Sequence, residues 1–552
     1  MKFEGKINLK GNPFYLSLDD INWIENTIDQ MSLEEKVGQL FCLDIGSGSK
    51  KDLDDILKYN TGGVFIRMHF KSHNWKICKY LQENSKIPLL ISSDLECGGL
   101  FGAINGTWFS TQMGVAATNN EDYAYKLGLV IGLEGTAIGF NWSYSPVLDI
   151  NFNHRNPIVN VRSYGDKPDL IKKMAISQIK GIQECGMAAT AKHFPGDGVD
   201  DRNQHYVTTC NSLSYEEWKN SFGSVYEAAI NAGVKSIMTA HIYFPGYYYK
   251  IYQNPDINQI MPGSLSYELN TKLLREELKF NGLIVTDATG MVGFKSLGKK
   301  EELIPKCINS GVDMFLFARD RKSDFEIMFD AAKRGIITEE RLESALYRIL
   351  ALKASLKLHE KKLNGNLIPP KSSLKIVGCK KHNQWAENCA ENSITLVKDN
   401  QKIIPIDRAL YRKILLIKSG DFNFITWKFK RLMKKVGFKI KSYNKITHIT
   451  NKNIDLVLYL FTESVASNRN NLLVNIKKIG GMEYFADKFP TILISLANPY
   501  HLYEFPRIKT VINAYAPFPI VIKTLVQKLI GNQEFKGINP VNAFCNIFDS
   551  KL

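Results

Sequence analysis

The sequence predicts an α/β fold, with a (β/α)₈ TIM-type barrel over residues 1–367 followed by a smaller α/β sandwich domain over residues 368–552. Eight short apolar runs recur in the first 320 residues, and runs that are apolar throughout are typical of strands covered on both faces. Helix-like segments separate them, and the chain is too long for one compact core. An open doubly wound sheet is the alternative arrangement of the same units.

The predicted strands of the barrel alternate with helical segments. The strands are 37–46, 61–68, 87–96, 141–150, 187–196, 234–242, 281–290 and 312–320. Among the helices, residues 169–186 place Ile171, Ala175, Ile179 and Ile182 at helical spacing. Residues 267–282 end on a glycine suited to a helix stop.

The second domain is predicted to begin near residue 368. A helical stretch at 339–358 closes the barrel, and residues 364–375 form a connector rich in Gly, Asn and Pro. Further apolar runs at 412–420, 454–461, 491–499 and 510–516 alternate with helical segments. We find no G-x-G-x-x-G fingerprint or phosphate loop in this part, so a nucleotide site has little support.

Composition describes a folded, water-soluble chain. Hydrophobic residues make up 44% and charged residues 23%, which excludes wholesale disorder. The start lacks the apolar run of a signal peptide, and no run of about 18 apolar residues occurs elsewhere. We therefore expect a cytoplasmic protein with no membrane partner. The nine cysteines contain no C-x-x-C pair, which favours reduced thiols over a disulfide framework or a zinc knuckle.

The net charge of +16 is concentrated at one end of the chain. Residues 371–552 hold 29 Lys and Arg against 12 Asp and Glu. A basic face that attracts an acidic partner is one explanation, and a solvated lysine-rich surface is the other. We expect no nucleic-acid partner, and the sequence makes no prediction of oligomeric state.

Polar residues follow the predicted strands, where a barrel enzyme places its chemistry. They are Asp94 and Glu96, Asp149, Lys192 and His193, His241, and Asp287. Asp287 is a candidate nucleophile, base or metal ligand, with a helix N-cap as the alternative. His205 is a candidate proton donor and acceptor near neutral pH, and Asn203 is placed to orient its ring. Asp197, Asp200 and Asp201 are expected to be solvated loop charges.

Several of these positions have a second interpretation. Lys192 and His193 are adjacent, so only one points into the barrel unless the backbone bulges; with a bulge, both are candidate donors to sugar hydroxyls. Glu96 is expected to make a hydrogen bond within a turn. His241 is a pocket residue or a satisfied core histidine. No spacing of histidines or cysteines fixes a metal geometry, so we expect no metal.

Five motifs in one order resemble glycoside hydrolase family 3, and most closely its β-N-acetylglucosaminidase branch. They are "MSLEEKVGQLF", "DLECGG", "NVRSYGD", "KHFPGDG" with a histidine downstream, and "VTDATGM". The segment "AENSITLVKDNQKIIPI" also resembles the start of the family's C-terminal sandwich, so the resemblance covers nearly the whole chain.

The resemblance implies a retaining exo-glycosidase that releases terminal β-linked N-acetylglucosamine by double displacement, without a metal or organic cofactor. Its substrate would be a small soluble glycoside or a cell-wall-derived sugar. Asp287 would be the nucleophile and His205 the acid/base. The residues that would hold the sugar's hydroxyls are Asp94, Arg162, Lys192 and His193; an ion pair with Asp149 or Asp166 is the alternative role for Arg162.

The sequence departs from the family pattern at the acid/base pair and at the sugar contacts. The family pairs its loop histidine with an aspartate where this chain has Asn203, and Gly99 and Gly102 replace two arginines. Asparagine can fix the imidazole tautomer but adds no charge. A β-glucosidase, a β-glycoside phosphorylase and a catalytically silent sugar-binding protein therefore stay as alternatives.

Overall fold

The computed structural model describes residues 7–443, 453–479 and 485–551, and the chain forms two compact units. The first comprises Met1–Thr107, Tyr125–Asp149 and Lys172–Cys379. The second comprises Trp108–Ala124, Ile150–Ile171 and Lys380–Leu552. The predicted domain division at residues 367/368 stays a prediction.

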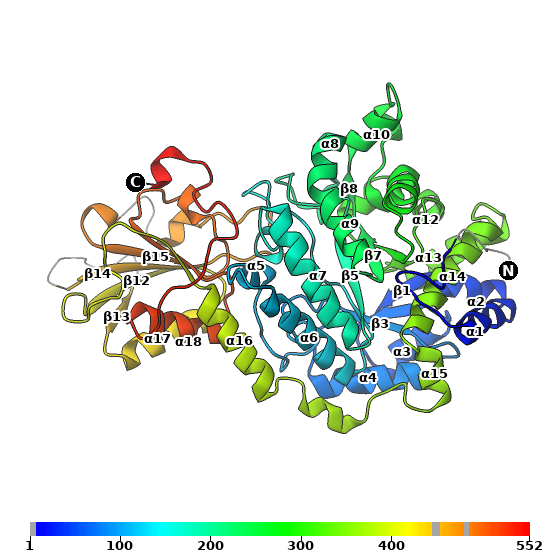
Figure 1. Ribbon diagram of the computed structural model, residues 1–552, viewed down its shortest axis with the longest axis horizontal. Helices are drawn as coiled ribbons and strands as arrows, with labels where there is room; N and C mark the ends of the chain where they lie inside the picture. Colours follow the sequence, from blue (N-terminus) through cyan, green and yellow to red (C-terminus); the bar gives the residue numbers. More distant parts are fainter. Residues whose placement is uncertain (1–6, 444–452, 480–484, 552) are drawn as a thin grey trace. The chain divides into compact units, whose positions relative to one another are not determined.

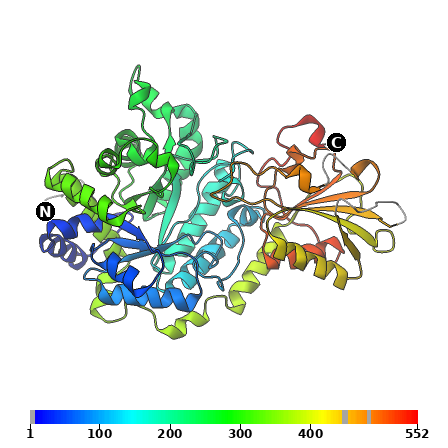
Figure 2. The same ribbon diagram turned by 180° about the vertical axis from the view of Figure 1, so that it is seen from behind.

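The first unit contains an eight-stranded parallel barrel surrounded by helices (Figure 1; Figure 2 shows it from behind). The strand order is β10-β1-β2-β3-β4-β5-β7-β9, and a parallel bridge between Val285 and Met314 joins the last strand to the first. The predicted barrel is confirmed and the open sheet is wrong. Its strands are β1 (Phe41–Asp44), β2 (Gly63–Phe65), β3 (Leu90–Ser93), β4 (Trp142–Ser143), β5 (Ala188–Phe194), β7 (Ser236–Thr239), β9 (Leu283–Thr286) and β10 (Phe315–Leu316).

The helices around these strands match the predicted alternation. Main helices are α1 (Leu18–Asp29), α2 (Leu33–Gln39), α3 (Lys50–Leu57), α4 (Lys71–Asn84), α6 (Glu121–Ile138), α7 (Pro168–Glu184), α9 (Ser224–Asn231), α12 (Lys300–Asn309), α13 (Arg321–Lys333), α14 (Glu339–Ser355) and α15 (Leu358–Leu363). On α7, the four residues at helical spacing are all buried. The predicted helix stop at Gly282 is wrong: the π-helical segment Glu268–Glu277 ends earlier, and Lys279 takes the left-handed conformation there (φ +59°).

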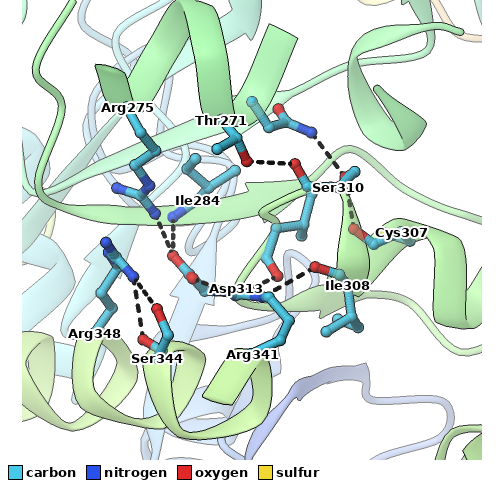
Figure 3. Close-up of polar contacts among 12 residues, drawn as sticks. Thr271, Arg275, Ile284, Cys307, Ile308, Ser310, Asp313, Arg341, Ser344 and Arg348 are labelled. Atoms are coloured by element: carbon cyan, nitrogen blue, oxygen red, sulfur yellow. Dashed lines mark hydrogen bonds and ion pairs between the residues drawn. The ribbon is translucent and has the colours of Figure 1, made fainter. Parts of the chain in front are cut away.

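One buried carboxylate fastens the seam between β9 and β10. Asp313 accepts hydrogen bonds from the backbone N–H of Ile284 (2.9 Å), from Arg275 Nη2 (2.6 Å) and from Arg341 Nη2 (2.8 Å). Figure 3 shows both guanidinium groups directed at Asp313. The carboxylate is fully buried, so the ion pairs compensate the cost of removing its charge from water.

The second unit is built on a six-stranded sheet of order β11-β16-β15-β14-β12-β13, parallel except for the pair β11–β16. Helices α16 (Lys380–Ser393), α17 (Asn423–Lys435) and α18 (Pro519–Leu529) lie side by side on one face (Figure 1). The predicted runs form β12 (Lys413–Gly420), β14 (Leu456–Thr462), β15 (Thr491–Ser495) and β16 (Thr510–Asn513). The outer strands are β11 (Thr395–Asp399) and the largely exposed β13 (Lys439–Ser442).

No helix within the described ranges is long and apolar enough to cross a bilayer. No two of the nine cysteines, all of which the structure describes, form a disulfide.

Candidate active site

Asp287 directly follows β9, at the carboxyl end of the barrel. Its backbone N–H donates to Thr239 O of β7 (2.8 Å), and its Oδ1 accepts from the Ala288 N–H (2.7 Å). The next helix, α11 (Val292–Lys295), has Met291 at its N-cap. The N-cap alternative for Asp287 is therefore wrong, because the carboxylate lies before the helix and does not cap it.

Contacts with the ends of both neighbouring strands brace the turn that carries Asp287. On the β10 side, Thr289 Oγ1 donates to the carbonyl oxygens of Leu316 (3.0 Å) and Phe317 (2.7 Å). On the β7 side, His241 Nε2 donates to Ala288 O (3.1 Å). Since the carbonyl can only accept, His241 Nε2 carries the proton.

His241 is fully buried, and its second ring nitrogen, Nδ1, lies 2.9 Å from Ser264 Oγ. Burial is the main influence on its pKa and holds that pKa below the usual histidine value, so the ring is neutral at neutral pH. Both ring nitrogens thus contact the protein in this conformation. Its predicted role as a pocket residue stays a prediction, and the contacts favour a positioning role.

Three histidines act electrostatically on Asp287. Burial is the largest single influence on the pKa of Asp287 and raises it, but the histidines and one backbone N–H together outweigh burial, so the pKa lies below the usual aspartate value. In order of effect these groups are His193, His241, His205 and the Ala288 N–H. A carboxylate that stays ionised in a partly buried site has the charge state that a nucleophile requires.

The loop that carries His205 is fastened to the segment after Asp287. The Val292 N–H donates to His205 O (3.0 Å), and Thr208 Oγ1 donates to Gly293 O (2.7 Å). A Cβ on Gly293 would lie only 2.5 Å from Gln204 O, so glycine is needed for this close approach. The backbone of the loop therefore packs directly against α11.

Asn203 contacts the ring of His205 directly. Asn203 Oδ1 lies 2.8 Å from His205 Nδ1 and 2.9 Å from the His205 backbone N. Because an amide oxygen only accepts, this contact places a proton on Nδ1. Asn203 is buried, and His205 is partly exposed.

A backbone irregularity, one of the two arrangements that the sequence leaves open at Lys192 and His193, is present. The register between β5 and β7 shifts between Ala191 and Phe194, and both side chains contact carboxylates that follow other strands of the barrel. Lys192 Nζ lies 2.7 Å from Glu96 Oε1 and 3.4 Å from Asp94 Oδ1. Lys192 is almost fully buried, whereas the Asp94 side chain is 50% exposed. Asp94 is thus the accessible member of this group.

Asp149, to which the sequence analysis assigned no catalytic or binding role, makes several of the contacts that hold the site together. Its Oδ2 lies 2.6 Å from His193 Nδ1, and its Oδ1 accepts from the backbone N–H groups of His193 (3.1 Å) and Asp197 (2.8 Å). The expectation of a solvated Asp197 is wrong, since this residue is 3% exposed. The position of Asp149 after a predicted strand was the available signal.

The structure also places Arg162, another predicted contact of the sugar. Arg162 ends a short 3₁₀ helix (Asn160–Arg162) of the second unit, so its predicted contact with the sugar stays a prediction.

A Cβ on Gly99 would lie 2.0 Å from Glu134 Oε2, and one on Gly102 would lie 2.6 Å from Leu95 Cδ2. The side chains of Glu134 and Leu95 therefore occupy the space that a side chain would enter at these two positions.

Asp20, His359 and Glu360 form a group, within the described residues, whose possible metal-ligand atoms lie within 4.8 Å of one another. They belong to α1 and α15. Lys357 Nζ contacts both oxygens of Asp20 (3.0 and 2.9 Å), so an ammonium group already neutralises the central carboxylate.

Comparison with known proteins gives one consistent family. The sequence profile of the glycosyl hydrolase family 3 N-terminal domain matches residues 32–352. A relative from Cellulomonas fimi, described as a β-N-acetylglucosaminidase/β-glucosidase, is 37% identical over 99% of this chain and all of its own length. A β-hexosaminidase A of Pseudoalteromonas piscicida is 30% identical over 59% of this chain and 56% of its own.

Solved structures agree with the barrel and sandwich architecture. A β-glucoside phosphorylase bound to 2FGlc superposes with a TM-score of 0.94 at 37% identity, covering 98% of this chain and 99% of its own. A family 3 β-N-acetylglucosaminidase from Paenibacillus sp. has a TM-score of 0.78 at 24% identity and covers 94% of this chain and all of its own. The second of these likenesses concerns the fold alone.

Proposed function

Because the chain belongs to glycosyl hydrolase family 3, we propose that it is a retaining exo-glycosidase that releases terminal β-linked N-acetylglucosamine from small soluble glycosides or cell-wall-derived sugars. The observation that carries the proposal is the surroundings of Asp287: a braced carboxylate with a lowered pKa, influenced by a loop histidine. This is the arrangement that double displacement needs, with one nucleophile and one separate proton carrier.

In the first step the Asp287 carboxylate attacks the anomeric carbon, and His205 protonates the leaving oxygen. His205 must then hold protons on both ring nitrogens, because Nδ1–H is committed to Asn203 Oδ1. In the second step the neutral ring accepts a proton from water, which hydrolyses the covalent glycosyl-enzyme. Asp94, held by Lys192 on one side and partly exposed on the other, is placed to accept hydrogen bonds from sugar hydroxyls.

The activities named for the relatives support an order of preference between two sugars. The Cellulomonas fimi protein is described by both N-acetylglucosaminidase and glucosidase activities, and the Pseudoalteromonas piscicida protein is a hexosaminidase. We therefore place N-acetylglucosamine first and glucose second.

Asn203 favours a second candidate, a β-glycoside phosphorylase. An inorganic phosphate acceptor already carries negative charge and needs no strong base to attack the glycosyl-enzyme. The neutral His205–Asn203 pair places less negative charge near such an acceptor than a histidine–aspartate pair would. A structure described as a β-glucoside phosphorylase also matches nearly the whole chain.

Turnover of nitrophenyl glycosides tests both candidates. Nitrophenyl β-N-acetylglucosaminide and β-glucoside are assayed with wild type and Asp287→Ala, each with and without inorganic phosphate, and the anomeric configuration of the product is read by NMR. We expect release with retention by wild type and a loss of at least a thousandfold in Asp287→Ala. A sugar 1-phosphate product identifies phosphorolysis. No release by wild type under any condition supports the silent sugar-binding protein.

A further inference from the structure

Positive charge is densest in one short part of the second unit, over β12, α17 and β13. Residues 411–443 contain ten Lys and Arg against a single acidic residue, Asp421. Asp421 forms an ion pair with Arg469, so its charge is already compensated. This part therefore accounts for a large share of the excess charge of the chain.

Helix α17 presents two different faces. Ile425, Phe429 and Met433 are buried, as expected for the face that packs on the sheet. The outward positions follow one another at spacings of three and four residues, so they form one stripe along the helix. They are Phe424, Trp427, Arg431 and Lys434.

The outward stripe is ordered by contacts between its own members. Phe424 and Trp427 are 60% and 53% exposed, yet their rings stack with centroids 5.8 Å apart. The Arg431 guanidinium lies 5.5 Å from the Trp427 ring centroid, within the range of a cation–π contact. The stripe thus has an aromatic end and a cationic end.

The cationic end of the stripe opens into a groove of about 480 Å³. Its lysines are Lys413, Lys434, Lys439 and Lys441. The apolar residues that line it include Ile414, Phe438 and Ile454, which are nearly fully buried. The groove therefore combines an apolar floor with a cationic rim. Lysines on an exposed edge strand often prevent pairing with strands of other molecules. This explanation applies to the lysines of β13 but not to those of α17.

We propose that this basic face, the α17 stripe together with the lysine groove, binds a linear anionic polysaccharide. Ammonium groups along a rim are complementary to a row of carboxylates, and an apolar floor suits the C–H faces of sugar rings. A planar bilayer does not enter a groove. Single-stranded nucleic acid binds chiefly by stacking bases on aromatic rings, whereas Trp427 already contacts Phe424 and Arg431.

The test compares two variants of the full chain with equal net charge. In the first, Lys434, Lys439 and Lys441 are each changed to Gln. The matched control changes Lys51, Lys58 and Lys322 of the first unit to Gln; these side chains are exposed. Binding of a polyuronate such as alginate oligomers is measured by calorimetry at 50 and 500 mM NaCl. We expect at least tenfold weaker binding in the groove variant, less than twofold change in the control, and strong weakening of wild type by salt.

Further probes decide between classes of partner. Dextran, single-stranded DNA and vesicles containing phosphatidylglycerol are measured in the same way. If the triple substitution disturbs folding, the single substitution Lys439→Gln gives a second groove variant, which is expected to weaken alginate binding. The proposal is overturned if alginate fails to bind, if both triple variants lose affinity equally, or if DNA or vesicles bind more tightly than alginate. Turnover of a nitrophenyl glycoside is followed separately, so binding is judged independently of the proposed catalysis.

Discussion

Asn203 fixes the tautomer of His205 without adding charge. The contact between Asn203 Oδ1 and His205 Nδ1 measures 2.8 Å, a distance that an aspartate could also make. The two side chains differ in electrostatics, since a carboxylate stabilises the imidazolium form and an amide does so only weakly. The identity of residue 203 therefore sets how easily His205 holds the proton that it transfers.

Asn203→Asp is expected to raise the pKa of His205 by about 1 unit, because a nearby negative charge favours the protonated ring. The basic limb of the kcat/KM profile should move to higher pH by the same amount, while phosphate becomes a poorer acceptor than in wild type. Both effects are measured from pH–rate profiles with and without phosphate. An unchanged profile would contradict the assignment of His205 and Asn203 as a pair.

Asp287 offers a second pH-dependent readout. Its pKa is lowered, with His193 the strongest of the groups that lower it. In wild type the acidic limb of kcat/KM that reports Asp287 should lie below the usual aspartate range. His193→Gln removes this group and should move the limb to higher pH, besides any effect on substrate binding. A limb that stays in place in this variant would argue against Asp287 as the nucleophile.

Some residues of this site could be predicted from the sequence and others could not. Asp287 and His205 were selected because both the residue type and its position, at a strand end or in a loop, indicate a role in catalysis. For Glu96 we expected only a hydrogen bond within a turn, and for Asp149 no role of its own in the site, because their contacts with Lys192 and His193 depend on the irregular end of β5. The geometry of such an irregularity is decided by tertiary packing and cannot be read from spacing.

At the level of elements, α11 acts as the platform on which the His205 loop rests. Gly293 is the point of closest approach, with a Cβ there 2.5 Å from Gln204 O and 2.8 Å from Val207 O. Both neighbours are backbone atoms, so the loop itself must move to make space for a side chain. The position of His205 therefore depends on a residue that has no chemical role.

Gly293→Ala is expected to lower kcat by about tenfold to a hundredfold, because a displacement of about 1 Å of a catalytic group has costs of this order. Gly290→Ala is the matched control, since a Cβ at Gly290 has nothing within 4 Å. Steady-state kinetics on the preferred nitrophenyl glycoside measures both. Equal effects of the two substitutions would show that the loop does not depend on this contact.

The seam between β9 and β10 is a second element-level feature, and it supports the strand that carries Asp287. Asp313→Asn leaves Arg275 and Arg341 facing a neutral group in a buried setting (Figure 3). We expect a loss of about 3–5 kcal/mol in the free energy of unfolding. Asp330→Asn, which breaks an exposed pair with Arg334, should cost less than about 1 kcal/mol. Urea unfolding that shows similar losses for both variants would contradict the role of the seam.

At the scale of the whole molecule, the apolar runs predicted the barrel and four strands of the second sheet, β12, β14, β15 and β16. The sequence did not reveal that residues 108–124 and 150–171 belong to the second compact unit. Their contacts there are long-range, as between Thr111 and Tyr515, or Asn160 and Asn498. Periodicity reports only local structure. Contacts with distant side chains assign these two segments to the second unit, and such contacts leave no signal in the local sequence.

Each unit has its own hydrophobic core, so we expect two calorimetric unfolding transitions and not one. Asp313 lies in the barrel, and Leu458 is fully buried in β14 of the second sheet. Asp313→Asn should lower the midpoint temperature of the barrel transition. Leu458→Ala leaves a cavity that costs about 2–5 kcal/mol, and it should lower the midpoint temperature of the other transition.

A ligand shows independently which transition belongs to which unit. A sugar bound at the strand ends raises the midpoint temperature only of the unit that holds it. Saturating product sugar should therefore shift the transition that Asp313→Asn lowers. Its effect on the transition that Leu458→Ala lowers reports whether residues of the second unit, Arg162 among them, contribute to sugar binding. A single transition that both substitutions lower equally would show that the two cores unfold as one cooperative structure.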